Sequence, residues 1–347
     1  VPNYTVAPVV ISLDQTDYYS LELGVGYSFV ERVRALLILS YANLFHRGHR
    51  ITLDGELSSI EQRGELIYST PWLFMVPLQT ELSGYYRRHD LLFFDVPLGF
   101  TGEFAGFSAT VGQVTEFGLS YGVGFNYENV IRLAVPGSET LPDSIPDKNT
   151  ASFDLNLSLD RRNDIFSPTR GYLARSSSEF AGVFGGATNQ FVKAEGEFSG
   201  YYNIGDALFF ASGVEFGWVG AYGESEIVPP QEQFFAGGPG SVRGYDFEKL
   251  IIDDRGNPVG GNVKLVVHVI DFRFPLFWWF WGAAFLDAGY VWQDLESIDL
   301  GDVKYGAGPS LRLMTPIAMV RFDVGFKLDP LDQEDLVVFY LDIGQAF

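Results

Sequence analysis

A glycine-rich stretch at residues 234–248, FFAGGPGSVRGYDFE, carries one basic residue, Arg243. A guanidinium in this setting suits three kinds of chemistry: an anion-binding loop, a catalytic loop, or a structural plug pinned by an ion pair. The stretch lacks the Lys-[Ser/Thr] end of a phosphate-binding loop, and no helical pattern follows it. A phosphate-binding loop and a catalytic loop are therefore disfavoured, and the role of Arg243 depends on the fold around it.

A second candidate is GLSYG at residues 118–122, which matches the G-x-S-x-G pattern of serine hydrolases with Ser120 as nucleophile. That chemistry requires a sharp strand-to-helix turn that exposes the serine. Here the pattern lies inside an alternating, strand-like segment, and no histidine or aspartate partner is evident. We therefore expect Ser120 to be a strand residue and expect no enzymatic activity.

Histidines and paired carboxylates are the remaining candidates for metal binding or acid–base chemistry. His46 and His49 are three residues apart, but they lie in a predicted turn without an obvious acidic third ligand. Glu195 and Glu197 share one face of a predicted strand, and we interpret them as structural residues of that face rather than as a glycosidase pair. We expect no metal site and no cofactor.

The composition limits the class of protein. Charged residues make up 19% of the 347 residues, below the usual quarter of a soluble domain. The net charge of −21 argues against nucleic-acid binding, which requires a basic surface. The charge-free apolar run at 274–286 is shorter than the roughly 20 residues of a membrane-spanning helix. The chain has no cysteine, and its first residues, VPNYTVAPVV, lack the basic start of a signal peptide.

The dominant sequence pattern has a period of two. In YSLELGVGYSF at 19–29, large apolar residues alternate with serine, glutamate and glycine. The segments 51–59, 151–161 and 319–328 show the same alternation. Such segments are typical of strands with one apolar face and one polar face.

A soluble sandwich and a membrane barrel would both give this alternation, and three features favour the barrel. The segments often run for about ten residues or more, against about five or six in globular sheets. Their apolar faces end in aromatic residues, as at membrane interfaces. Their polar faces carry glycines and charges, as a wet lumen requires. A closed barrel also satisfies every backbone group within a bilayer.

The sequence therefore predicts an all-β protein, a transmembrane antiparallel β-barrel of about 16 strands. Two longer polar connections interrupt the pattern, at 136–149 and at about 223–261, and the whole of 1–347 is interpreted as one barrel domain. The predicted strands span 18–29, 32–44, 49–60, 63–74, 77–88, 91–110, 113–134, 149–161, 171–183, 189–203, 206–221, 261–276, 278–292, 302–314, 317–329 and 336–347.

Several motifs, in order along nearly the whole chain, resemble the BamA/TamA superfamily of outer-membrane assembly and translocation barrels. The segment GGPGSVRGYDFE is similar to the V-R-G-[FY] loop of that superfamily, and FLDAG at 285–289 is similar to its F-x-D-x-G strand motif. The other matching segments are DRRNDIFSPTRGYL at 160–173, NLFHRGHR at 43–50 (where His46 departs from the first glycine), STPWLF at 69–74 and RLMTPIAMVRFDVGFKL at 312–328.

The resemblance implies a location for Arg243. In the superfamily this extracellular loop folds into the lumen, and its arginine pairs with acids on the barrel wall. The matching acids here are Asp271 and Asp287, and the period-two pattern independently directs both side chains inward. Removing one partner would leave a buried charge unpaired. The lumen-loop motif comprises Val242, Arg243, Gly244 and Tyr245.

The first and last predicted strands would meet where the barrel closes. The C-terminal segment LVVFYLDIGQAF alternates and ends on Phe347, which resembles an outer-membrane targeting signal. Gly24, Gly26 and Gly344 lie on these two strands, and glycine weakens a strand. Two interpretations stay open: a seam that opens laterally, as the resemblance implies, or glycines that ease strand curvature.

The resemblance implies a protein of the bacterial outer membrane that inserts or translocates other proteins through its seam and lumen loop. The implied partners are outer-membrane lipid, unfolded β-barrel or exported clients, and periplasmic accessory subunits, but no nucleic acid. The superfamily normally carries N-terminal POTRA repeats, which this chain lacks. The alternatives are the barrel of a patatin-like phospholipase fusion, a two-partner secretion pore, or a passive diffusion porin.

Overall fold

The structure is a computed structural model, and it describes residues 17–89, 100–134, 149–165, 168–182, 187–205, 207–314, 319–330 and 335–344. No helix in these segments has the length and apolar character needed to cross a bilayer.

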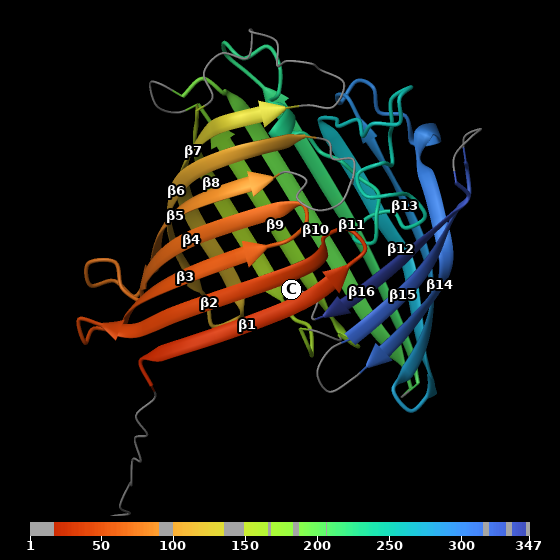
Figure 1. Ribbon diagram of the computed structural model, residues 1–347, viewed down its shortest axis with the longest axis horizontal. Helices are drawn as coiled ribbons and strands as arrows, with labels where there is room; N and C mark the ends of the chain where they lie inside the picture. The colour runs from red at the N-terminus through yellow and green to blue at the C-terminus, as the bar shows by residue number, and fades with distance from the viewer. Residues whose placement is uncertain are drawn as a thin grey trace, which may run out of the picture.

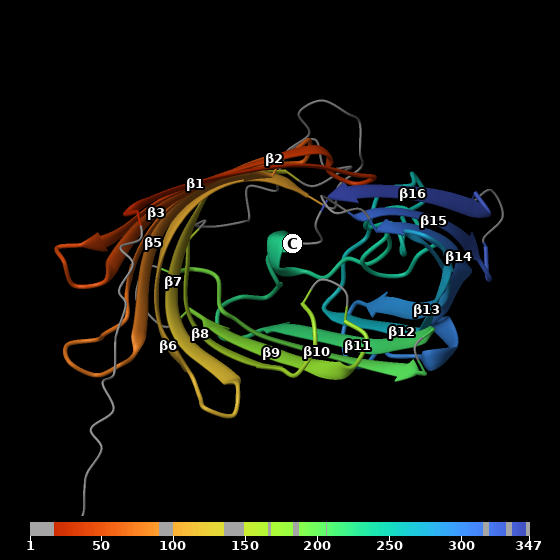
Figure 2. The ribbon, with the colours of Figure 1, turned by 90° about the horizontal axis from the view of Figure 1, so that it is seen from below.

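Sixteen antiparallel strands in the described segments close into a single barrel, each paired with its neighbours in sequence (Figures 1 and 2). The first strand, β1, pairs with the last, β16, and this contact completes the ring. The strands are β1 (Tyr19–Ser28), β2 (Arg32–Leu44), β3 (His49–Leu57), β4 (Glu61–Thr70), β5 (Gln79–His89), β6 (Thr101–Val114), β7 (Leu119–Ala134), β8 (Asn149–Asp160), β9 (Gly171–Ala181), β10 (Phe191–Ile204), β11 (Leu208–Ala221), β12 (Val263–Phe277), β13 (Phe280–Trp292), β14 (Lys304–Met314), β15 (Met319–Lys327) and β16 (Val337–Gly344).

The period-two pattern determines which side chains face outward. In β1, Leu21, Leu23 and Val25 are exposed on the outer surface, where lipid would cover them. In β16, Phe339 is 55% exposed while its neighbour Tyr340 is fully buried inside the barrel. Exposed apolar side chains recur on strand after strand, so the outside of the barrel is suited to a bilayer.

The predicted fold class is confirmed: the protein is a closed barrel of sixteen strands and not a two-sheet sandwich. Some boundaries are wrong. The strand predicted at 91–110 begins at Thr101, with residues 90–99 outside the described segments, and the strand predicted at 113–134 begins at Leu119. The turn between them lies at 115–118, where Gly118 adopts a φ of +80°, and not at the predicted break at 111–112.

Among the connections that the structure describes in full, the longest joins β11 to β12; the other long connection predicted from the sequence, at 136–149, lies almost entirely outside the described residues. This β11–β12 segment, residues 222–262, contains one short 3-10 helix, η1 (Pro230–Glu232). Figure 2 shows the segment inside the ring of strands rather than outside it. It therefore occupies space that a passive pore would leave open.

Candidate functional site

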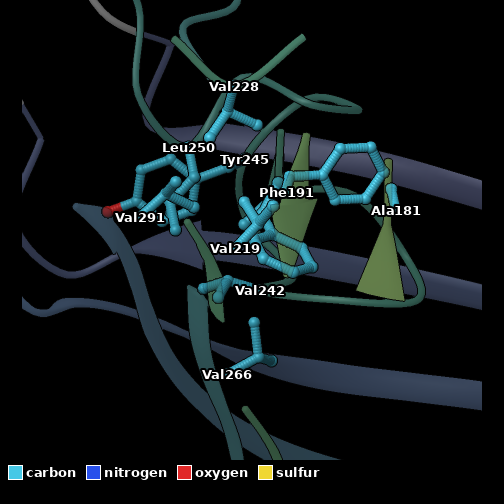
Figure 3. Close-up of a cluster of buried hydrophobic side chains, with 11 residues drawn as sticks. Ala181, Phe191, Val219, Val228, Val242, Tyr245, Leu250, Val266 and Val291 are labelled. Atoms are coloured by element: carbon cyan, nitrogen blue, oxygen red, sulfur yellow. The ribbon is translucent and has the colours of Figure 1, made fainter. Parts of the chain in front are cut away.

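The β11–β12 segment is packed against the barrel wall. Its side chains Val242, Tyr245 and Leu250 are fully buried and form one apolar cluster with Val219 and Val266 of the wall (Figure 3). Full burial of an aliphatic or aromatic side chain typically contributes about 1.5–3 kcal/mol. The segment is therefore an integral part of the fold and not a solvated loop.

Glycines shape the tip of this segment. Gly237, Gly238 and Gly244 all have φ near +100°, a backbone conformation that other residues rarely adopt. The amide of Gly238 donates to the carbonyl oxygen of Tyr245 at 2.9 Å, which closes the tip into a tight hairpin. This local geometry presents Arg243 to the wall.

Arg243 is 4% exposed and binds Asp287 of β13 through a two-pronged ion pair. Its Nε donates to Asp287 Oδ2 at 2.6 Å, and its Nη2 donates to Oδ1 at 2.9 Å. The backbone amide of Arg243 donates to Oδ2 as well, at 3.2 Å. Because Asp287 is fully buried, this geometry satisfies a carboxylate that would otherwise be costly to bury.

The ion pair belongs to a wider network on the same wall. Asp271 of β12 accepts from Arg243 Nη1 at 3.4 Å, from Arg273 Nε at 2.6 Å and from Arg312 Nη2 at 2.8 Å. His268 Nδ1 lies 3.0 Å from Asp287 Oδ1. The guanidinium of Arg243 therefore joins the β11–β12 segment to β12 and β13, and Asp271 extends the network to Arg312 of β14.

An aromatic ring completes the cage around Arg243. Its guanidinium carbon lies 3.7 Å from the ring centroid of Phe285, a cation–π contact. Phe285 and Asp287 both belong to the FLDAG motif, which places them two residues apart on the inner face of β13. The first and third residues of the motif, Phe285 and Asp287, therefore contact the same guanidinium group, one through its ring face and the other through its carboxylate.

Glycines on the wall allow the segment to approach closely, and the sequence analysis missed them. A Cβ at Gly306 of β14 would overlap the carbonyl oxygen of Arg243, and one at Gly325 of β15 would overlap the amide of Gly244. A Cβ at Gly289 would lie 2.8 Å from Val242 Cγ2. Each of these strands carries a glycine at an inward-facing position, and this pattern could have indicated a close approach. The sequence does not show what each glycine contacts.

Gly244→Ala is expected to weaken the docking of the segment. Its φ of +108° costs a substituted residue about 1–2 kcal/mol, and the new methyl group would lie 3.1 Å from the backbone of Phe326. The measurement is thermal unfolding in detergent micelles, with Gly240→Ala as control because a Cβ there meets no atom within 4 Å. Equal melting temperatures for both variants would contradict the close fit.

Tyr340 of β16 is a second residue that the sequence analysis missed. The amide of Gly244 donates to its hydroxyl oxygen at 2.9 Å, and the hydroxyl donates to the carbonyl oxygen of Tyr245 at 2.7 Å. Its ring contacts Phe29, next to the end of β1, edge to face at 5.5 Å. The period-two pattern put Tyr340 on the inner face, but only the closed barrel brings it to the segment and to Phe29.

Within the described residues, the seam between β1 and β16 has one registered backbone pair. Its registered pair is Tyr27 with Ile343, whereas β1 is in register with β2 along its whole length. A Cβ at Gly26 would lie 3.2 Å from the carbonyl oxygen of Ile343, so this glycine lies directly at the seam. Gly24 contacts Leu36 of β2, and Gly344 pairs with Met319 of β15. Phe347 lies outside the described residues.

One side chain supplements the backbone at the seam. Asp342 of β16 accepts from the amide of Phe29 at 3.4 Å and from Arg321 Nη2 of β15 at 2.7 Å. This carboxylate therefore links the end of β1 to two strands at the other side of the seam. The sequence pattern alone does not distinguish Asp342 from the other inward-facing acids.

The candidates for catalysis and metal binding lie in the barrel wall and its turns. Ser120 lies within β7, paired with Ser158 of β8. His49 is hydrogen-bonded to the hydroxyl of Tyr68. Glu195 and Glu197 lie near Ser177 and Arg175 of β9 at 3.4 Å. Within the described segments, no group of three His, Cys, Asp or Glu side chains is arranged to hold a metal ion.

The sixteen strands form a closed barrel with an apolar exterior, and a buried Arg–Asp network holds the β11–β12 segment inside it. These two features define a transmembrane β-barrel with a structured interior. Residues 43–347 match the Omp85 superfamily domain, and the chain belongs to this superfamily. It is an outer-membrane β-barrel protein, as the sequence motifs indicated.

Two curated relatives are outer membrane protein assembly factors BamA. The chain is 27% identical to that of Neisseria meningitidis serogroup B over 218 residues, which cover 52% of this chain and 26% of the relative. It is 24% identical to that of Nitratidesulfovibrio vulgaris over 315 residues, which cover 88% of this chain and 39% of the relative. The chain thus spans well under half the length of both.

Solved structures share the fold. BamA from Haemophilus ducreyi lacking POTRA domains 1–3 has a TM-score of 0.80 at 19% identity, covering 95% of this chain and 70% of that chain. CdiB from Escherichia coli has a TM-score of 0.64 at 14% identity, covering 96% and 68%. CdiB from Acinetobacter baumannii has a TM-score of 0.59 at 15% identity, covering 95% and 60%. At these identities the likeness concerns the fold alone.

Proposed function

We propose that this chain is the barrel of a factor that inserts or translocates other proteins at the outer membrane, acting through the β1–β16 seam. The observation that carries the proposal is the seam itself, where Tyr27 and Ile343 form the registered pair. The clients would be unfolded β-barrel or exported proteins, with outer-membrane lipid and periplasmic accessory subunits as further partners. The BamA relatives support this choice, because they are assembly factors by name.

The physical basis is strand addition. In a bilayer core, an unpaired backbone amide or carbonyl costs several kcal/mol, so a parted seam strongly favours any strand that can pair with it. Backbone hydrogen bonds give such pairing direction without requiring a particular client sequence. Within the described residues, one registered pair joins β1 to β16 while β1 and β2 are registered along all of β1, so parting the described part of the seam is less costly than parting β1 from β2.

The interior network would brace the wall while the seam moves. Arg243 and Asp271 tie the β11–β12 segment to β12, β13 and β14, and Tyr340 extends the contact to β16. We infer that these strands stay together and that β1 moves away from them. Val242, Gly244 and Tyr245 would hold the segment in place. The proposed steps make and break only non-covalent contacts, so we infer no enzymatic activity and no cofactor.

Locking the seam tests this proposal. The chain has no cysteine, so Tyr27→Cys with Ile343→Cys introduces one defined pair at registered positions. Oxidised, this variant is expected to lose at least about 90% of its acceleration of client barrel insertion into vesicles, a factor of ten. Reduction of the disulfide should restore the rate.

The matched control is Val25→Cys with Ala35→Cys, which joins β1 to β2 at registered positions away from the seam. This lock should leave the insertion rate near that of the unmodified barrel. A seam-locked barrel that inserts clients at the normal rate would disprove lateral opening. Steady large conductance in planar bilayers would instead indicate a pore.

A further inference from the structure

Two turns at one rim of the barrel present large apolar side chains to the surroundings. The turns that follow even-numbered strands lie at the end of the barrel opposite the β11–β12 connection, because neighbouring strands are antiparallel. In the β4–β5 turn, residues 71–78, Phe74 and Met75 are each 93% exposed. In the β12–β13 turn, Trp278 is 92% exposed and is followed by Trp279. Neither turn carries a charged residue.

The backbone of both turns is strained at the exposed aromatic residue. Phe74 has a φ of +54° and Trp278 a φ of +49°, a left-handed conformation that glycine or asparagine adopts far more readily. The β6–β7 turn of the same rim has a glycine, Gly118, at its positive-φ position. In the β4–β5 turn the amide of Leu73 donates to the carbonyl oxygen of Val76 at 3.0 Å, so the apex is a formed turn. The chain therefore keeps an aromatic residue at each apex despite a backbone cost.

The apolar surface of the strands continues into both turns. Leu66 of β4 and Leu276 of β12 are exposed on the lipid-facing side of the wall. Trp72 and Trp278 extend this surface past the ends of the two strands. Indole rings are enriched at the level of the lipid headgroups, where the ring meets apolar surroundings and its N–H meets polar groups. A lipid leaflet therefore matches both turns.

The positions of the two turns on the ring favour lipid over a bound protein. The strands β1–β4 separate the β4–β5 turn from the seam on one side, and β13–β16 separate the β12–β13 turn from it on the other. The two turns thus lie on opposite sides of the ring, at equal numbers of strands from the seam. A bilayer surrounds the barrel on every side, whereas one protein would have to span the barrel opening to cover both turns.

We propose that the β4–β5 and β12–β13 turns insert Phe74, Met75 and Trp278 into the headgroup region of the lipid leaflet at this rim, as two anchors placed symmetrically about the seam. The β2–β3 turn also has an aromatic residue, Phe45, at a φ of +57°, but Arg47 gives that turn a charge, so the proposal does not extend to it. If β1 parts from β16 as proposed above, the anchors hold the wall to the leaflet on both sides of the moving strands. This consequence rests on the proposed function, whereas the lipid contact does not.

The test measures the depth of each turn in vesicles of dioleoylphosphatidylcholine, without any client. Because the chain has no cysteine, Met75→Cys and Trp279→Cys each place one nitroxide label beside an intact apex residue. Collisions with oxygen, which concentrates in lipid, and with a water-soluble nickel complex report the surroundings of the label. The control is Glu116→Cys, an exposed position in the β6–β7 turn of the same rim. The labels at 75 and 279 are expected to collide mainly with oxygen, and the label at 116 mainly with the nickel complex.

Phe74→Asn and Trp278→Asn, each combined with the label in its own turn, separate lipid contact from turn structure. Asparagine accepts a positive φ, so each turn should keep its shape, and the gel mobility of the unheated barrel checks that the variants are folded. Each change is expected to lower the ratio of inserted to free turn about tenfold, because full burial of an aromatic side chain favours the buried state by at least that factor.

The proposal is overturned if the label at 75 or at 279 is as accessible to the nickel complex as the label at 116. A turn in water in these vesicles would instead be a surface for a protein partner. An asparagine variant that leaves its label at the same depth would also overturn the proposal. Neither result decides whether the seam opens, which the seam disulfide tests separately.

Discussion

Arg243→Ala is expected to destabilise the barrel by about 3–5 kcal/mol, the usual cost of breaking a buried ion pair by removing one partner. Asp287 is fully buried and would lose both side-chain hydrogen bonds from residue 243, retaining the backbone amide of that residue and His268 as its partners. Asp271 would suffer less, because Arg273 and Arg312 still contact it. The ring of Phe285 would also lose its cation.

The measurement combines thermal unfolding in micelles with limited proteolysis of the β11–β12 segment. Arg243→Ala should lower the melting temperature and make the segment cleavable, and Asp287→Asn should do the same to a smaller extent because it keeps the size of the side chain. The control is Arg63→Ala, whose partially exposed pair with Glu65 contributes at most about 1 kcal/mol. If Arg243→Ala and Asp287→Asn both behave like the unmodified barrel, the bracing role is wrong.

The barrel was predictable because a bilayer imposes a strict pattern on each strand. Leu21, Leu23 and Val25 face lipid, and the residues between them face the lumen. Apolar and polar residues therefore alternate along the strand with a period of two. The same rule placed Asp271 and Asp287 inside. Their pairing with Arg243 came from the motif resemblance, since alternation specifies a face but not a partner.

The contacts that the sequence did not reveal depend on how the barrel closes. Tyr340 meets Gly244, nearly a hundred residues earlier, because β16 returns to the side of the ring where the β11–β12 segment lies. A Cβ at Gly306 or Gly325 would overlap the backbone of the β11–β12 segment, and this is apparent only when the segment is packed against β14 and β15. Register and closure are set by all sixteen strands together, and no local pattern encodes them.

Tyr340→Phe is the second prediction with a large expected effect, because it removes one oxygen atom that couples the segment to the seam. The variant keeps the ring and its contact with Phe29. It leaves the buried amide of Gly244 without its acceptor, at a cost of about 1–3 kcal/mol, whereas the carbonyl of Tyr245 loses this hydroxyl but keeps the amide of Gly238. The tip of the segment should loosen, and β16 should lose its tether to it.

Two readouts separate these effects. Hydrogen exchange of the 242–245 amides should accelerate at least about tenfold, in line with the lost free energy. Disulfide formation between Tyr27→Cys and Ile343→Cys should become slower, because a β16 that is no longer tethered holds Ile343 opposite Tyr27 for less of the time. The control is Tyr121→Phe, which removes a hydroxyl bonded to exposed Gln113 of β6, and it should change neither readout. Faster exchange with unchanged cross-linking would show that the segment is anchored by Tyr340 but does not communicate with the seam.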